Sequence, residues 1–183
     1  FSDFSACCFD EILNQAAKIN FMFGGQFPCG LVLRLPGGVS LSAAAQHSQS
    51  LEGIFAHIPG LKVVYPSNPT DAAGLLVASI HDGNPVMFFE HKRLYAIKGE
   101  VAEGEILPIE LGKGSVARTG KDLTILATGM YVDLCKEIAE EYSKNGIEIE
   151  IIDPRCLVPF DKEMLFESIN KTGKLIVVTE ETK

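Results

Sequence analysis

The chain has 183 residues, of which 46% are hydrophobic and 22% charged, an ordinary balance for a globular protein of one or two domains. Its formal net charge is -8, and Lys92-Arg93 is the only adjacent pair of basic residues. This acidic balance argues against nucleic acid or an anionic membrane as a partner, since both favour basic surfaces. No apolar run is long enough to span a bilayer.

The cysteines give no sign of a metal site. They are odd in number, none has metal-ligand spacing, and two of them are neighbours: Cys7, Cys8, Cys29, Cys135 and Cys156. We expect them to be small buried residues in a reducing compartment, the cytoplasm or an organelle matrix.

The first half of the chain alternates between strand and helix patterns. Apolar residues near helical spacing over 4–19 predict a buried helix. Asn68-Pro69 predicts a helix start, because Asn is a preferred N-cap and Pro suits the first helical position. The remaining patterns predict strands at 31–35, 61–66 and 86–91, with helices at 51–58 and 69–80. Short loops between them favour a parallel sheet.

Residues 96–120 are rich in glycine and charge, and predict a linker with an edge hairpin. After them the alternation restarts, with strands at 123–128, 147–152 and 175–178 and helices at 132–143 and 161–170. We therefore predict an α/β protein with two tandem units. Its domains are 1–95 and 121–183, joined by 96–120.

His47 is the strongest candidate for chemistry. It lies in Ala43-Ala44-Ala45-Gln46-His47-Ser48-Gln49-Ser50, between a glycine-containing loop and a predicted helix, at the edge of the sheet where ligands bind. Histidine can donate or accept a proton at neutral pH. The alternative is a histidine that caps the helix it precedes, and spacing alone leaves both open. His57, His81 and His91 are interpreted as structural.

The Asp82-Gly83-Asn84-Pro85 turn also has two interpretations. Gly and Asn commonly end helices, so it can be a plain helix stop. The unpaired carbonyl groups at a helix C-terminus carry partial negative charge and can also collect a monovalent cation.

Several long stretches together resemble one enzyme family. They include AAAQHSQSLEGIFAHIPGLKVVYPS, DGNPVMFFEHKRLY and IEIIDPRCLVPFDKE. The chain is similar to the β subunit of the thiamine-diphosphate-dependent first component of 2-oxo-acid dehydrogenase complexes. The residues around the histidine resemble acetoin dehydrogenase β chains more than pyruvate or branched-chain ones.

The resemblance implies a partial pyrimidine-binding-type domain followed by a partial transketolase C-terminal-type domain. It implies an α2β2 heterotetramer in which the α subunit holds the diphosphate and Mg²⁺ of thiamine diphosphate. A lipoyl-bearing acyltransferase would receive the acyl group after oxidative C–C cleavage. By the same resemblance, Phe4 contacts the aminopyrimidine ring and His47 is the active-site histidine. Potassium would be bound by main-chain carbonyl groups of Leu31, Ser79, Ile80, Asp82 and Asn84.

One feature of the family pattern is absent. The glutamate that activates the cofactor lies upstream of Phe1 in the family, so we expect a chain cut at both ends that is inactive alone. Two other classes stay open: a transketolase-like synthase half, for which no basic cluster is seen, and a non-catalytic interaction module.

Overall fold

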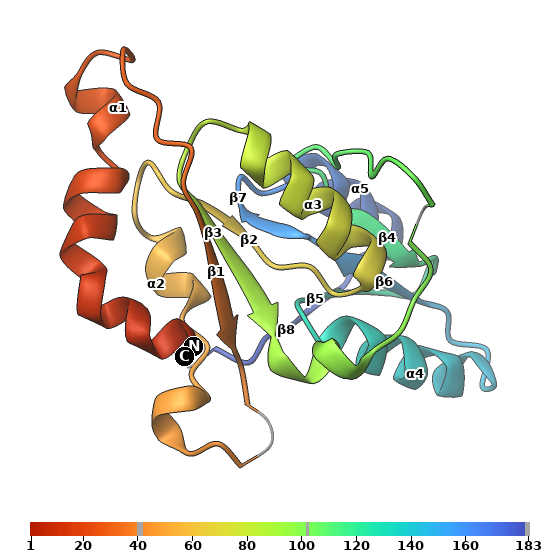
Figure 1. The fold of residues 1–183 in the computed structure, drawn as a ribbon. Helices are drawn as coiled ribbons and strands as arrows, with labels where there is room; N and C mark the ends of the chain where they lie inside the picture. Colours follow the sequence, from red (N-terminus) through yellow and green to blue (C-terminus); the bar gives the residue numbers. More distant parts are fainter. Residues whose placement is uncertain (40–41, 102, 182–183) are drawn as a thin grey trace.

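The computed structural model describes residues 1–39, 42–101 and 103–181 and contains two four-stranded sheets (Figure 1). The first has the order β1-β3-β2-β7, formed by β1 (Val32–Gly37), β2 (Lys62–Val64), β3 (Val86–His91) and β7 (Cys156–Val158). β3 is parallel to β1 on one side and to β2 on the other, with Val86 paired to both Val32 and Lys62. The parallel sheet expected for the first half is therefore present.

The side chains of β3 alternate between the two faces of the sheet, as successive residues of a strand do. The sheet is therefore the middle of three layers, with helical segments packed on each face. Met87 and Phe89 pack with α2 (Glu52–Ala56) and the N-terminal segment. Val86 and Phe88 pack on the other face, with Leu75 of α3 (Pro69–His81). Figure 1 shows one helical layer on each side of the first sheet, with α2 on one side and α3 on the other. All six residues of β3 are buried, as expected for a central strand covered on both faces.

The predicted start of α3 is confirmed. Asn68 is the N-cap and its side-chain oxygen accepts the Asp71 backbone N–H at 2.9 Å, while Pro69 is the first helical residue. The helix ends at the predicted turn, with Asp82 as its C-cap.

The second sheet has the order β4-β6-β5-β8, formed by β4 (Ser115–Arg118), β5 (Leu123–Ala127), β6 (Ile149–Asp153) and β8 (Leu175–Val178). β5 is parallel to both β6 and β8. Apolar residues of α4 (Tyr131–Ser143), including Val132 and Ala139, pack against β5 and β6. α5 (Lys162–Thr172) meets β5 through buried hydroxyls, with Ser168 and Thr172 at 2.7 and 2.6 Å from Thr124. The second α/β unit is as predicted.

One strand from the second half of the chain, β7, belongs to the first sheet, which the sequence did not predict. β7 comes from the second half of the chain but pairs antiparallel with β2 of the first sheet. Beside it, the Arg155 guanidinium contacts both carboxylate oxygens of Asp71, at 2.9 and 2.6 Å. The halves are thus joined by both backbone and side-chain contacts.

The N-terminal segment differs from the predicted buried helix. It contains the 3-10 helix η1 (Ser2–Cys8), the π-helix η2 (Glu11–Ala16) and α1 (Ile19–Met22). η1 buries Ser2 and Ser5, not its apolar residues, so Cys7 and Cys8 are exposed and the prediction that they are buried is wrong. Cys135 and Cys156 are buried as expected.

The described residues of 96–120 form one edge strand, β4, in place of the expected hairpin. β4 pairs antiparallel with β6, which follows it only after β5 and α4, so none of its described partners is a hairpin neighbour. Before it, η4 (Lys92–Ala96) continues directly from β3. None of the helices in the described part of the chain has the length and apolar character needed to cross a membrane.

Candidate functional site

The site is built at the carboxyl ends of β1 and β3. β1 ends at Gly37 and β3 at His91, in parallel register, so the segments that follow both strands begin at one edge of the sheet. The segment after β1 carries the 3-10 helix η3 (Ala45–His47). Ligands of parallel α/β sheets bind at this edge, which is where the sequence placed His47.

The structure brings the two predicted residues Phe4 and His47 together. The His47 ring lies edge-on to the Phe4 ring, with centroids 5.3 Å apart, and edge-on to Phe1 at 4.4 Å. Both phenylalanines remain about half exposed, at 48% for Phe1 and 50% for Phe4. Both rings are therefore partly open to a planar ring that comes from outside the chain.

The capping alternative for His47 is wrong. The N-cap of α2 is Leu51, and no side chain caps that helix. His47 is the last residue of η3, several positions earlier. His57 and His81 end α2 and α3, as the sequence predicted for structural histidines.

The segment that carries His47 has a strained backbone. Ser42 and Ala44 have φ of 50 and 64 degrees, a region that residues with a Cβ seldom occupy. Contacts to the rest of the protein hold the segment: the Gly38 backbone N–H donates to the Gln49 carbonyl at 3.1 Å, and the Gln49 amide donates to Asp3 at 2.8 Å. Such strain persists only where the surroundings over-determine it.

Lys92 reaches the same segment from β3. Its ammonium group donates to the main-chain carbonyl of His47 and lies 5.1 Å from the centre of the Phe1 ring. The side chain is buried although it is charged. The sequence did not indicate this residue, but it follows the carboxyl end of a predicted strand, the same signal that indicated His47.

Three carboxylates gather beside the site. Glu180 accepts a hydrogen bond from His91 Nε2 at 2.8 Å, and Glu181 accepts the Gly53 backbone N–H at the start of α2. Glu52 is 2% exposed, and one of its oxygens has no hydrogen-bond partner among the described residues. Burial, together with Glu181 and Glu180, raises the pKa of Glu52 to about 7. Burial lowers the pKa of His91 despite the nearby carboxylate.

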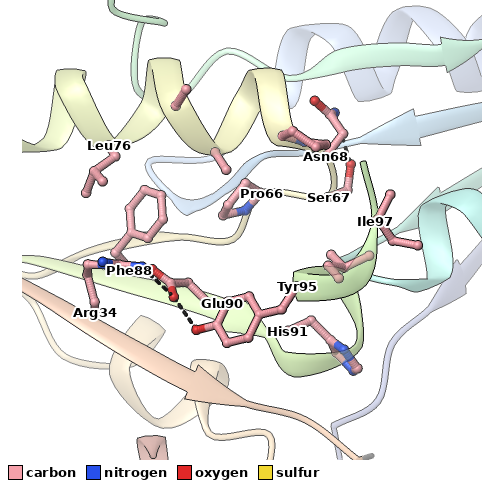
Figure 2. A pocket seen from close by; sticks show the side chains of 14 residues that line it. Arg34, Pro66, Ser67, Asn68, Leu76, Phe88, Glu90, His91, Tyr95 and Ile97 are labelled. Atoms are coloured by element: carbon pink, nitrogen blue, oxygen red, sulfur yellow. Dashed lines mark hydrogen bonds and ion pairs between the residues drawn. The ribbon is translucent and has the colours of Figure 1, made fainter. Parts of the chain in front are cut away.

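A separate cavity of about 350 Å³ lies between α3 and the sheet. Figure 2 shows its polar floor, where Glu90 lies between Arg34 and Tyr95. Arg34 contacts both Glu90 oxygens, at 2.5 and 3.0 Å, and the Tyr95 hydroxyl donates to the same carboxylate. No predicted site residue lines this cavity, and its polar side chains are already hydrogen-bonded: Arg34 and Tyr95 to Glu90, Ser67 to Asp153 and His91 to Glu180.

The residues of the expected cation site come from two segments that lie together. The Cys29 backbone N–H donates to the Gly83 carbonyl at 3.0 Å, and Val86 donates to the Leu31 carbonyl at 2.8 Å. The Asp82 carboxylate bonds Lys62 and, at 2.8 Å, Asn84. Burial works to raise the pKa of Asp82, but these two hydrogen bonds outweigh it and the pKa lies below its usual value. The Asp82 carboxylate is thus engaged by two side chains, and a cation at this turn would be bound mainly by main-chain carbonyl groups.

No group of three or more His, Cys, Asp or Glu side chains within 1–39, 42–101 and 103–181 is arranged to hold a metal ion.

Two family models match the chain. The model described as transketolase, pyrimidine binding domain, covers residues 1–98, and the one described as transketolase, C-terminal domain, covers 112–183. The chain belongs to the transketolase pyrimidine-binding family. The two matches follow the order that the resemblance implied: β1, β2 and β3 lie in the first, and all four strands of the second sheet lie in the second, together with β7, which joins the first sheet.

The curated relatives that match the chain include β subunits of oxidoreductases and dehydrogenases. The chain is 49% identical to the acetoin:2,6-dichlorophenolindophenol oxidoreductase subunit beta of Bacillus subtilis (strain 168), over 98% of the chain and 52% of the relative. It is 46% identical to the 2-oxoisovalerate dehydrogenase subunit beta of the same organism, over 100% and 56%. The chain thus spans about half the length of these relatives.

Two further likenesses agree with the fold. The chain is 42% identical to the pyruvate dehydrogenase E1 component subunit beta of Rhizobium meliloti (strain 1021), over 97% of the chain and 39% of the relative. A solved structure named "split gene transketolase, inactive beta4 tetramer" superposes with a TM-score of 0.79 at 22% identity. The superposition covers 99% of this chain and 56% of the chain in that solved structure. At that identity, the likeness shows the fold alone.

Proposed function

We propose that the chain is part of the β subunit of a thiamine-diphosphate-dependent acetoin dehydrogenase, which cleaves acetoin oxidatively and passes the acyl group to lipoamide. The observation that carries the proposal is the His47 imidazole beside the half-exposed Phe4 ring, at the carboxyl edge of the pyrimidine-binding-type sheet. The 49% identity to the acetoin oxidoreductase β subunits of two organisms supports the choice of substrate.

The residues present fit the pyrimidine side of the cofactor. The exposed face of Phe4 offers the apolar surface that a planar aminopyrimidine ring stacks on, and Phe1 extends that surface. Thiamine diphosphate, when bound, supplies the nucleophilic chemistry that breaks a carbon–carbon bond next to a carbonyl group. We infer that its diphosphate and Mg²⁺ are held by an α subunit in an α2β2 heterotetramer.

The role of His47 follows from its position. An imidazole at the rim of the aromatic cluster can give a proton to, or take one from, the oxygen of a reacting carbonyl. The Phe1 and Phe4 rings contact the imidazole edge-on and so limit the orientations it can adopt. We propose that His47 assists transfer of the acyl group to the lipoyl arm of an acyltransferase partner.

We also propose that main-chain carbonyls of Leu31, Ser79, Ile80, Asp82 and Asn84 bind potassium at the end of α3. Two observations support this: the 29–31 segment lies against the turn, and the Asp82 carboxylate is already occupied. A potassium ion there would join β1 to the C-terminus of α3, next to the strand that leads to the site.

The experiment that tests the substrate is a comparison of three compounds. The polypeptide that carries this chain is co-expressed with its α-type partner and loaded with thiamine diphosphate and Mg²⁺. Turnover of acetoin, pyruvate and 3-methyl-2-oxobutanoate is then measured. We expect kcat/KM for acetoin to exceed the others by roughly tenfold or more, a difference of about 1.4 kcal/mol in transition-state binding. A preference for the branched 2-oxo acid would overturn the acetoin assignment and favour the 46% identical class of relative.

A further inference from the structure

Lys92 is a buried cation whose ammonium group contacts the His47 cluster. Its side chain is 8% exposed, and it forms no ion pair with a carboxylate within the described ranges. A buried ammonium group is costly unless it is partnered. Its partners here are the His47 carbonyl, to which it donates, and the face of the Phe1 ring, 5.1 Å away.

The element that carries His47 cannot hold its own position. η3 has three residues, closed by a hydrogen bond of 3.3 Å from the His47 backbone N–H to the Ala44 carbonyl. Isolated turns of this length are unstable, and Ala44 adds the cost of a positive φ. The contacts of Gly38 and Gln49 hold the segment on either side of η3, and the hydrogen bond from Lys92 is the contact made at His47 itself.

β3 is well suited to anchor that contact. It is the central strand between β1 and β2 and is buried along its whole length, and Lys92 is the first residue after it. A reactive side chain is held most precisely when it is tied to a rigid element.

We propose that Lys92 is a positioning residue, which ties the His47 carbonyl to the end of β3 and so fixes the imidazole against the two phenylalanine rings. The proposal rests on the proposed function for its effect on turnover. Its structural part, the anchored position of His47, is independent of the substrate. The inference adds a second residue to the site, one that acts through His47 and not on the substrate.

The first test uses turnover of the assembled enzyme with Lys92→Met, which keeps the length of the side chain and removes the charge. We expect kcat for acetoin to fall roughly 10- to 100-fold with KM little changed, since misplacement of a catalytic group by about 1 Å costs on the order of 10²-fold. The separate variant Lys92→Arg keeps the positive charge and should retain much of the wild-type rate. Lys144→Met, at the exposed end of α4, is the matched control and should leave kcat unchanged. A raised KM with unchanged kcat would overturn the proposal, because Lys92 would then bind the substrate.

The second test needs no turnover, so it separates this proposal from the proposed function. The ring of His47 is edge-on to Phe1 and Phe4, and its carbon-bound protons therefore carry ring-current shifts in the NMR spectrum. In the 183-residue chain, Lys92→Met should move the His47 resonances toward free-histidine values and Lys92→Arg should not. The exposed His57 and His81 should stay in place in both variants. Unmoved His47 resonances in Lys92→Met would contradict the anchoring, whatever the activity of the enzyme.

A measurement on the unaltered chain covers the case in which Lys92→Met fails to fold. Sparing acetylation followed by mass spectrometry reports the reactivity of each lysine. Buried and bonded, Lys92 should react at least about tenfold more slowly than exposed Lys144, equivalent to about 1.4 kcal/mol of protection. Equal rates would overturn the anchored geometry.

Discussion

At the scale of single residues, the site is a meeting of groups far apart in the sequence. Phe4 and His47 were predicted from a family resemblance, and the structure places their rings 5.3 Å apart. Spacing alone left His47 open between a cap and a reactive group, because one histidine near a helix start fits both. Lys92 and Glu52 were not predicted, since a lysine after a strand or a glutamate in a helix is ordinary until its burial is known.

Glu52 gives a pH-dependent prediction. Its carboxyl group has a pKa near 4.5 in the unfolded chain and about 7 in the folded one, so the folded state keeps the proton up to a higher pH. The free energy of unfolding contributed by this group therefore falls as pH rises from about 4.5 to about 7. Glu52→Gln should remove that loss, and at pH 7.5 it should stabilise the chain relative to the wild type by on the order of 1–3 kcal/mol.

Urea unfolding at pH 5 and at pH 7.5 checks this prediction. The difference between wild type and Glu52→Gln should be small at the lower pH and large at the higher one. Glu137→Gln, on the exposed face of α4, should show no such change. Parallel pH profiles for wild type and Glu52→Gln would show that the buried carboxyl is not perturbed.

At the scale of elements, the order of strands and helices was predictable because their apolar patterns are strong. The start of α3 at Asn68-Pro69 is a clear case, confirmed by the Asn68 cap. The N-terminal segment was mispredicted because the spacing of apolar residues does not reveal which face of a helix packs against the protein. η1 buries two serines and exposes both cysteines. β7 was missed because three residues carry too little pattern to indicate a strand.

The C-terminus of α3 carries the prediction at this scale. If its carbonyls bind potassium, the chain should melt at a higher temperature in potassium chloride than in sodium chloride at equal ionic strength. A concentration 100 times the dissociation constant would stabilise the fold by about 2.7 kcal/mol. For a chain of this size that is a rise of roughly 5–10 °C. Identical melting curves in the two salts would contradict the proposed potassium site.

At the scale of the whole molecule, the two α/β units could be predicted but their connection could not. β7 adds to the edge of the first sheet, and Arg155 reaches Asp71 at the start of α3. Contacts between residues this distant in sequence leave no local pattern. The sites on the first unit are therefore supported by the second, through β7 and through Glu180 on His91.

Breaking the Arg155–Asp71 pair tests that connection. The Asp71 side chain is 3% exposed, so Arg155→Met leaves a buried charge without its partner and should lower the free energy of unfolding by about 3–5 kcal/mol. Adding Asp71→Asn should recover part of the loss, because the uncompensated charge is then gone. Lys136→Met, which breaks a surface pair with Asp133, should cost at most about 1 kcal/mol. Equal losses for Arg155→Met and Lys136→Met in chemical denaturation would show that the link contributes little.

The most direct test of the central claim is acyl transfer from acetoin to lipoamide by the assembled, thiamine-diphosphate-loaded enzyme carrying His47→Ala. Because His47 is proposed to move a proton during the transfer, the rate should fall by roughly 10²- to 10⁴-fold, with the fold and the melting temperature retained. His57→Ala, which alters an exposed histidine at the end of α2, should transfer acyl groups at the wild-type rate. Transfer by His47→Ala at the wild-type rate would contradict the account.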